Sequence, residues 1–251
     1  MSGRLNLTLF AHVCARPEAD LDLAEAALLI AEAEYPGLDV ARYLALLDEL
    51  GRSTKAAAAR ARPVGSATME EARLDRAVRF VFDDAGFHGN EDDYYDPRNS
   101  FLSDVIDRRT GIPISLAVVL IEICRRAEID ARGVAFPGHF LVRCDTARGA
   151  VIVDPFAGRA LTRDEVRALY KRATGEDGDP PPKLFGPATK TQILARMLHN
   201  LRAIYEQQGD GARQLAVLEK LLVVSPSEAL RAQVQKLGGS EPWRARGGGI
   251  N

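Results

Sequence analysis

Three residues in the middle of the chain have side chains suited to covalent chemistry: Ser115, His139 and Asp154. Ser115 lies near the start of an apolar stretch, His139 precedes a β-rich run, and Asp154 follows the next one. A helix amino end favours an anion, a histidine can take a proton from a hydroxyl, and an aspartate can hold the imidazole in one tautomer. The order and spacing therefore allow a Ser115-His139-Asp154 triad for acyl transfer or hydrolysis.

The same side chains also have structural roles open to them. Ser115 can bond a free backbone N–H group in the first turn of a helix. Because a serine is much less acidic than a cysteine, a catalytic Ser115 would need His139 as its base throughout. His139 and Asp154 can equally form a buried hydrogen-bonded pair that fixes a sheet to a helix. The residues alone leave both interpretations open.

The three cysteines do not supply a nucleophile. Cys124 lies well inside the apolar stretch, where a thiolate would be desolvated, and Cys144 is expected on the strand face opposite His139. Cys14 is remote in sequence. We interpret all three as structural thiols. Their odd number and irregular spacing indicate a reducing compartment, without disulfides or a zinc site.

No metal or cofactor site is predicted. The segment at residues 88–97 is rich in carboxylates that would suit a divalent cation, but it lacks the spacing of a calcium loop. We expect it to be a solvated acidic loop. His12, His88 and His199 are scattered and show no ligand spacing. No glycine-rich phosphate loop follows a predicted strand.

A buried helix and a small antiparallel sheet must position the candidate residues. Pro113 suits the first helical turn, because its missing N–H group costs nothing there. The residues from there to Arg126 are apolar on nearly every side, so this helix must be central and covered. Three short β-rich runs follow, at residues 132–136, 140–144 and 151–153. The pattern predicts an α+β core in which His139 and Asp154 lie on consecutive strands.

Helical periodicity predicts the elements around this core. A helix from Leu21 stops at Pro36, and a second helix, from Val40, is expected to end at Gly51. Three further helices have predicted caps: Thr68 with Glu71, Asn99 with Ser100, and Thr162 with Glu165.

Five parts are predicted along the chain. They are an amino-terminal helical region at residues 1–67, an α+β core at 68–174, a linker at 175–190, a helical hairpin at 191–237 and a flexible tail at 238–251. The hairpin resembles one tetratricopeptide repeat, from Tyr205 through Leu222 to Pro226, although Gln214 stands where that motif prefers alanine. A peptide groove generally needs about three such repeats, so the hairpin is expected to support the core.

The composition of the chain argues against nucleic acid and membranes as partners. The 251 residues carry a formal net charge of −2, so no attraction to nucleic acid or to a membrane surface is implied. The first residues do not have the pattern of a secretion signal, and the longest apolar run is too short to cross a bilayer. We expect a cytoplasmic protein.

The central motifs resemble a known superfamily. NSFLSDVIDRRTGIPISL, FPGHFLVR and VDPF are similar to the SirB-type bacterial branch of the transglutaminase-like superfamily, and the resemblance runs from the DLAEAALLIAEAEYP helix to Pro226. It implies a cysteine-protease-like core followed by tetratricopeptide-like helices, with His139 and Asp154 as base and orienting acid. In that superfamily a cysteine opens the helix. By counting from Gly111 and Ala117, Pro113 takes its place here.

The replaced cysteine leads us to expect a noncatalytic or regulatory protein, whose old active-site cleft and neighbouring helices bind a protein or peptide. The alternative is a Ser115-His139-Asp154 amidase or acyl transferase that acts on a peptide or protein amide. A third possibility is a peptide-binding helical repeat protein. The sequence does not identify the partner or the oligomeric state, nor whether the acidic loop at residues 88–98 covers the cleft.

Overall fold

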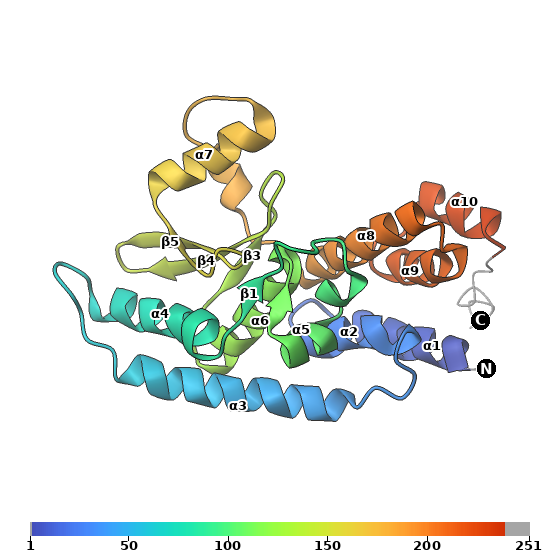
Figure 1. The fold of residues 1–251 in the computed structure, drawn as a ribbon, viewed down its shortest axis with the longest axis horizontal. Coiled ribbons are helices and arrows are strands. Elements are labelled where there is room, and N and C mark those ends of the chain that lie inside the picture. Colours follow the sequence, from blue (N-terminus) through green and yellow to red (C-terminus); the bar gives the residue numbers. More distant parts are fainter. Residues whose placement is uncertain (1, 239–251) are drawn as a thin grey trace, which may run out of the picture. The chain divides into compact units, whose positions relative to one another are not determined.

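The computed structural model describes residues 2–238, and the chain divides into two compact units (Figure 1). One unit runs from Asp39 to Thr189, and the other combines the residues up to Leu38 with those from Lys190 onward. The chain therefore divides after Leu38, and the expected end of an amino-terminal region at residue 67 stays a prediction. The predicted tail, apart from Gly238, lies outside the described residues.

The central helix of the larger unit is α6, Pro113–Arg126. Its proline occupies the first helical position, as predicted, and every residue from Pro113 to Cys124 is buried. The apolar run predicts this burial, since a helix without a polar face must be covered on all sides. Glu122 is the one acidic residue in this helix, and it is neutralised by ion pairs with Arg125 and Arg126 at 3.0 and 2.5 Å.

A four-stranded antiparallel sheet follows α6. Its strands are β3 (Arg132–Val134), β4 (Leu141–Thr146), β5 (Gly149–Asp154) and β6 (Arg159–Leu161), in that spatial order. The mixed helical and antiparallel composition agrees with the expected α+β class. The sequence analysis predicted the first three strands and missed β6. The prediction that His139 lies on a strand is wrong, because the residue belongs to the turn just before β4, whereas Asp154 ends β5.

Helices cover both sides of the sheet (Figure 1). On one side lie α3 (Val40–Ala59), α4 (Met69–Arg79) and α6, with a π-helical turn η2 (Phe80–Asp84) extending α4. On the other side lies α7 (Arg163–Thr174), followed by the short η4 turn (Pro182–Phe185). The predicted capping boxes at Thr68 and Thr162 are both present.

The prediction that α3 ends at Gly51 is wrong. The helix continues to Ala59, and Gly51 is buried within it. A Cβ atom at this position would lie 2.3 Å from the Cβ of Arg126, so the glycine lets α3 approach α6 closely. Arg126 also pairs with Asp48 at 2.6 Å, which ties the same two helices together.

A long excursion precedes α6. It starts at β1 (His88–Gly89), passes through η3 (Pro97–Asn99) and α5 (Leu102–Arg108), and returns at β2 (Thr110–Gly111). The two short strands pair in parallel, which closes the excursion at its base. Asn99 and Ser100 do not cap α5 as predicted, because the cap position is Phe101 and no side chain bonds there.

The smaller unit is entirely helical within the described residues. It contains α1 (Ser2–Cys14), α2 (Leu23–Ile30) with η1 (Ala31–Ala33), α8 (Lys190–Gln208), α9 (Gly211–Val224) and α10 (Glu228–Lys236). α8 and α9 pack on each other and form the predicted hairpin, while α1 and α10 were not predicted. Between residues 2 and 238, no helix combines the length and the apolar character that a membrane span requires.

Candidate functional site

The predicted contact between His139 and Asp154 is present. The Nε2 atom of His139 lies 2.9 Å from Oδ1 of Asp154, and the two side chains are only 16% and 9% exposed. The ring N–H direction is not aligned with this oxygen, so Nε2 has no well-oriented hydrogen-bond partner among the described residues. A short turn positions the histidine, whose backbone N–H group donates to the carbonyl of Phe136 at 3.0 Å.

The turn after β5 holds the carboxylate of Asp154. Its Oδ1 atom accepts hydrogen bonds from the backbone N–H groups of Phe156 at 2.9 Å and Ala157 at 3.2 Å. Burial by itself raises the pKa of Asp154, but His139 and the two N–H groups outweigh it and hold the pKa below its usual value. Asp154 is therefore an ionised, oriented partner for the imidazole.

Ser115 forms its hydrogen bonds with the backbone. Its Oγ atom donates to the carbonyl of Asn99 at 2.6 Å and accepts the N–H group of Ile112 at 3.1 Å. The side chain is fully buried. These bonds satisfy a free donor at the start of α6 and join that start to the preceding excursion. No described contact connects Ser115 with His139.

The start of α6, where the sequence predicts a nucleophile if the protein is an enzyme, is buried inside the protein. Gly111, Ile112 and Pro113 are all buried. A Cβ atom at Gly111 would lie 2.7 Å from the Ser115 Oγ, which explains why a residue without a side chain precedes the helix. Pro113 contributes neither a nucleophile nor a backbone N–H group at this point.

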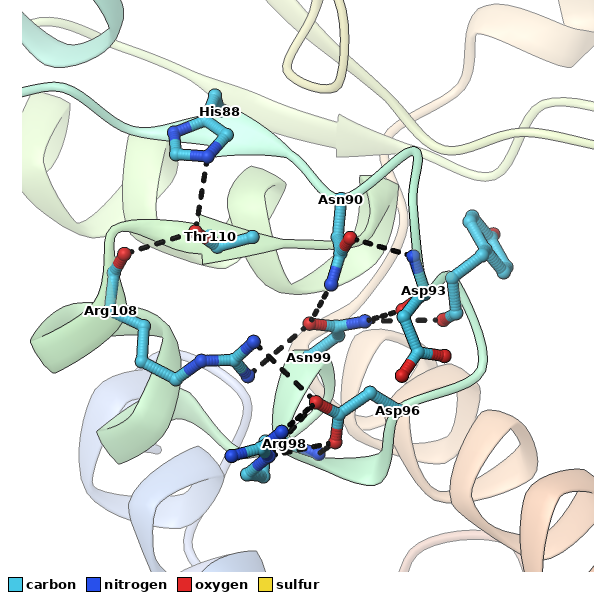
Figure 2. Close-up of polar contacts among 9 residues, drawn as sticks. His88, Asn90, Asp93, Asp96, Arg98, Asn99, Arg108 and Thr110 are labelled. Carbon is cyan, nitrogen blue, oxygen red and sulfur yellow. Dashed lines mark hydrogen bonds and ion pairs between the residues drawn. The ribbon is translucent and has the colours of Figure 1, made fainter.

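Asn99 organises the loop that encloses this helix start (Figure 2). Its amide oxygen accepts hydrogen bonds from Asn90 at 3.1 Å and from Arg108 at 3.4 Å. Its amide nitrogen donates to the carbonyl of Asp93 at 2.7 Å. Since the backbone carbonyl of Asn99 also binds Ser115, a single buried asparagine connects the loop to α6.

The acidic loop divides into two parts. Glu91, Asp92 and Asp93 are exposed, as expected for a solvated loop. Asp96 is buried instead and pairs with Arg98 at 2.7 Å and with Arg108 at 3.5 Å. Burial by itself raises the pKa of Asp96, but these guanidinium groups hold it below its usual value. The loop is thus pinned by one internal carboxylate and presents the other three to solvent.

Two aromatic side chains, Tyr94 and Phe156, connect this loop to the turn that follows Asp154. A Cβ atom at Gly89 would lie 2.6 Å from the ring of Phe156, so the ring packs directly on β1. The same ring meets Tyr94 edge to face, with 6.1 Å between centroids. Tyr94 and Tyr95 are 42% and 64% exposed. A partly exposed aromatic surface therefore lies beside the turn that carries Asp154.

The cysteines lie where structural thiols are expected. Cys124 and Cys144 are buried, and burial raises the pKa of Cys144 to about 12 and that of Cys124 further still. Burial also raises the pKa of Cys14 to about 12. Thiols that ionise this poorly are weak nucleophiles near neutral pH. Among residues 2–238, no group of histidine, cysteine and carboxylate side chains is arranged to hold a metal ion.

Asn99, Phe156 and Tyr94 contribute to this site but were not predicted from the sequence. Asn99 was interpreted as a helix cap, and its actual role depends on residues up to sixteen positions away. No local sequence pattern predicted the contacts of Phe156 and Tyr94, because these contacts join segments that are far apart in the sequence. Their only signals were that Phe156 lies in the motif VDPF and that Tyr94 lies in the acidic segment at residues 88–97.

A family model for the transglutaminase-like superfamily matches residues 41–199, which is more than half of the chain. The chain belongs to the transglutaminase-like superfamily. Among the relatives of this transglutaminase-like chain, a UPF0162 protein of Xylella fastidiosa (strain Temecula1) is 36% identical over 92% of this chain and 82% of its own length. A UPF0162 protein of Pseudomonas aeruginosa is 31% identical over 81% of this chain and 72% of its own length.

A third relative is much longer than this transglutaminase-like chain. F-box only protein 21 of Homo sapiens is 32% identical over 54% of this chain, which corresponds to 22% of the human protein. No solved structure matches the chain.

Proposed function

We propose that this transglutaminase-like protein is noncatalytic or regulatory, and that it binds a protein or peptide partner at the surface around His139, Asp154 and Phe156. The observation that carries the proposal is the start of α6. Pro113 stands where the superfamily has its cysteine, and the nearby Ser115 hydroxyl bonds to the carbonyl of Asn99 at 2.6 Å. No side chain at this helix start is thus free to attack a substrate.

The aromatic surface supports a binding role. Tyrosine is enriched where proteins bind one another, because it combines a large apolar ring with a polar end and few rotatable bonds. Tyr94 and Tyr95 are exposed, while the hydrogen bonds of Asn99 hold the backbone of their loop in place. A surface ordered before binding loses little conformational entropy when a partner arrives.

A crosslinking experiment tests this proposal. A photoreactive phenylalanine analogue at Tyr95 should join the intact protein to one specific partner in its own cell extract. The same analogue at Val64, which is 84% exposed in the same unit, should not. Replacing Tyr94 and Phe156 with alanine should then abolish the crosslink. Equal crosslinking from both positions would contradict the proposal.

The alternative is a Ser115-His139-Asp154 amidase or acyl transferase acting on a peptide or protein amide. The retained contact of 2.9 Å between His139 and Asp154 favours it, because this pair could serve as base and orienting acid. It requires Ser115 to leave its bonds to Asn99 and Ile112. Labelling of Ser115 by a serine-directed fluorophosphonate, together with a turnover lost in Ser115→Ala, would establish this alternative.

We also propose that the chain belongs to the SirB-type branch and that α8 and α9 form a tetratricopeptide-like hairpin. The support is local. Gly209 takes a positive φ of 68° at the turn, Asp210 caps α9, and Tyr205 and Leu222 are buried as the repeat pattern expects. The finer domain boundaries and a cytoplasmic location remain parts of the same proposal.

A further inference from the structure

A pocket of about 630 Å³ lies between α4 and the β5–β6 hairpin. Its volume falls within the range of small-molecule sites, roughly 300–1,000 Å³. His139, Asp154, Phe156, Tyr94 and Tyr95 do not line it, so the inference does not rest on the function proposed above. Its walls come from α4, η2, the two strands and the turn at residues 157 and 158.

The inner surface of the pocket is apolar. Leu74 and Val78 contribute from α4, one helical turn apart. Val153 and Ala160 contribute from the sheet, where they are paired partners on β5 and β6. Because side chains alternate along a strand, Val151 lies on the same face as Val153. These five side chains form a strip that suits an aliphatic chain.

The charges at the rim are mostly paired. Arg79 binds Asp75 at 3.0 Å, and Arg159 binds Glu165 at 2.6 Å. Asp83 also lines the pocket, and within residues 2–238 its carboxylate has no ion pair or hydrogen bond. Glu71, the remaining charged lining residue, lies 3.6 Å from Arg148. Among the described lining residues, the charge left unneutralised is therefore the negative one of Asp83.

One end of the pocket is a fixed wall. Gly158 has a φ of +70°, and a Cβ atom there would lie 3.0 Å from the Cβ of Phe82 in η2. Both features favour glycine at this position. The turn consequently packs against η2, which carries Asp83.

We propose that this pocket binds an amphipathic organic cation, with an aliphatic chain along the Val78–Val153 strip and an ammonium group at Asp83. Burial of the aliphatic chain supplies most of the affinity, and the exposed carboxylate of Asp83 favours a positively charged head group. An anionic amphiphile of the same length is disfavoured, because both guanidinium groups are already engaged.

Three probes of equal chain length test the proposal on the intact protein: n-octylammonium, n-octanol and n-octanoate. Calorimetric titration below their aggregation concentrations gives the three dissociation constants. We expect octylammonium to bind up to about fivefold more tightly than octanol, and octanoate to bind least tightly. In an amide NMR spectrum, the Gly158 signal should move on titration, while that of Gly149, at the far end of the β5 strand, should not.

Matched variants test whether the probes bind in this pocket. Ala160→Phe fills it from an exposed position and should abolish binding, while Ala150→Phe, on the opposite face of β5, should leave binding unchanged. In Asp83→Asn, octylammonium and octanol should have equal dissociation constants. The dissociation constant of octanol should be the same as in the unmodified protein. The thermal transition of each variant confirms that it is folded.

Three results would overturn the proposal: no binding of any probe, tightest binding of octanoate, or equal losses in Ala160→Phe and Ala150→Phe. Equal binding of octylammonium and octanol to the unmodified protein would refute the role of Asp83. None of these results bears on crosslinking at Tyr95, so failure here and failure of the proposed function are separable.

Discussion

The ring of Phe156 occupies the space in which a side chain at Gly89 would begin. A Cβ atom at Gly89 would lie 2.6–2.8 Å from three atoms of that ring, closer than Cβ atoms approach in folded proteins. This relationship joins two parts of the site that are far apart in sequence: the base of the acidic loop and the turn that holds Asp154.

Gly89→Ala should lower the free energy of unfolding by about 1–3 kcal/mol, because the ring must shift to admit the methyl group. Urea denaturation measures this loss. Most of the loss should disappear in a Phe156→Ala background, where the space is already open. A penalty of the same size in both backgrounds would mean that the ring is not the obstacle.

Ser115→Ala should cost about 1–3 kcal/mol of stability, because it leaves the Asn99 carbonyl and the Ile112 N–H group without their partner. The control is Ser103→Ala. Ser103 is also buried, but its hydroxyl has no hydrogen-bond partner among the described residues, so its removal should be neutral or stabilising. Similar losses in both variants would indicate a packing effect.

Asp154→Asn should reduce stability in a pH-dependent way. Because the folded-state pKa of Asp154 is lowered, its contribution is complete above the usual carboxyl pKa of about 4 and is lost as the pH falls through the folded-state value. The difference from the unmodified protein should be roughly 1–3 kcal/mol at pH 6 and should shrink below pH 4. Urea titrations across this range measure it. The exposed Asp92→Asn should show little difference at any pH, and a constant difference for Asp154→Asn would contradict the pKa argument.

Asn99→Ala should loosen the loop of residues 90–98 and cost roughly 2–3 kcal/mol, because several hydrogen bonds to a buried amide are lost together. Amide hydrogen exchange should accelerate at Asp96 and Asn90. Asp92→Ala, which removes an exposed carboxylate from the same loop, should leave exchange at both positions unchanged. Protection in Asn99→Ala equal to that of the unmodified chain would exclude this role for Asn99.

Pro113→Cys introduces a thiol where the resemblance to the superfamily leads us to expect one, yet this thiol should react slowly. The site is buried, so the thiolate would be desolvated. Alkylation by iodoacetamide should be at least about tenfold slower than in Met69→Cys, which places a thiol at the exposed first position of α4. Faster alkylation at residue 113 would show that the loop opens to expose the helix start.

Much of the core follows from local sequence patterns. Pro113 and the apolar residues after it predict α6, and the Thr68–Glu71 and Thr162–Glu165 pairs predict two capping boxes that are present. The contact between His139 and Asp154 was predicted from strand order. These features depend on periodicity and on short-range hydrogen bonds, which a sequence displays directly.

The remaining features depend on contacts between distant segments. Gly51 suggested the end of a helix, but it lies within α3 because Arg126 needs the space beside it. Asn99 suggested a cap, but its amide holds the acidic loop together. Arg109 adopts a left-handed conformation, with a φ of 58°, where the chain turns from α5 into β2. No local pattern predicted these three roles.

The parallel pairing of β1 with β2 brings the two ends of the excursion at residues 90–109 together at a single point. The segment between them is therefore an insertion whose two ends are held together by the β1–β2 pair. Because the Asn99 carbonyl inside this segment bonds to Ser115, the part whose surface chemistry can change without disturbing the start of α6 is the exposed stretch at residues 91–95. The surface proposed to bind a partner can therefore change separately from the fold that supports it.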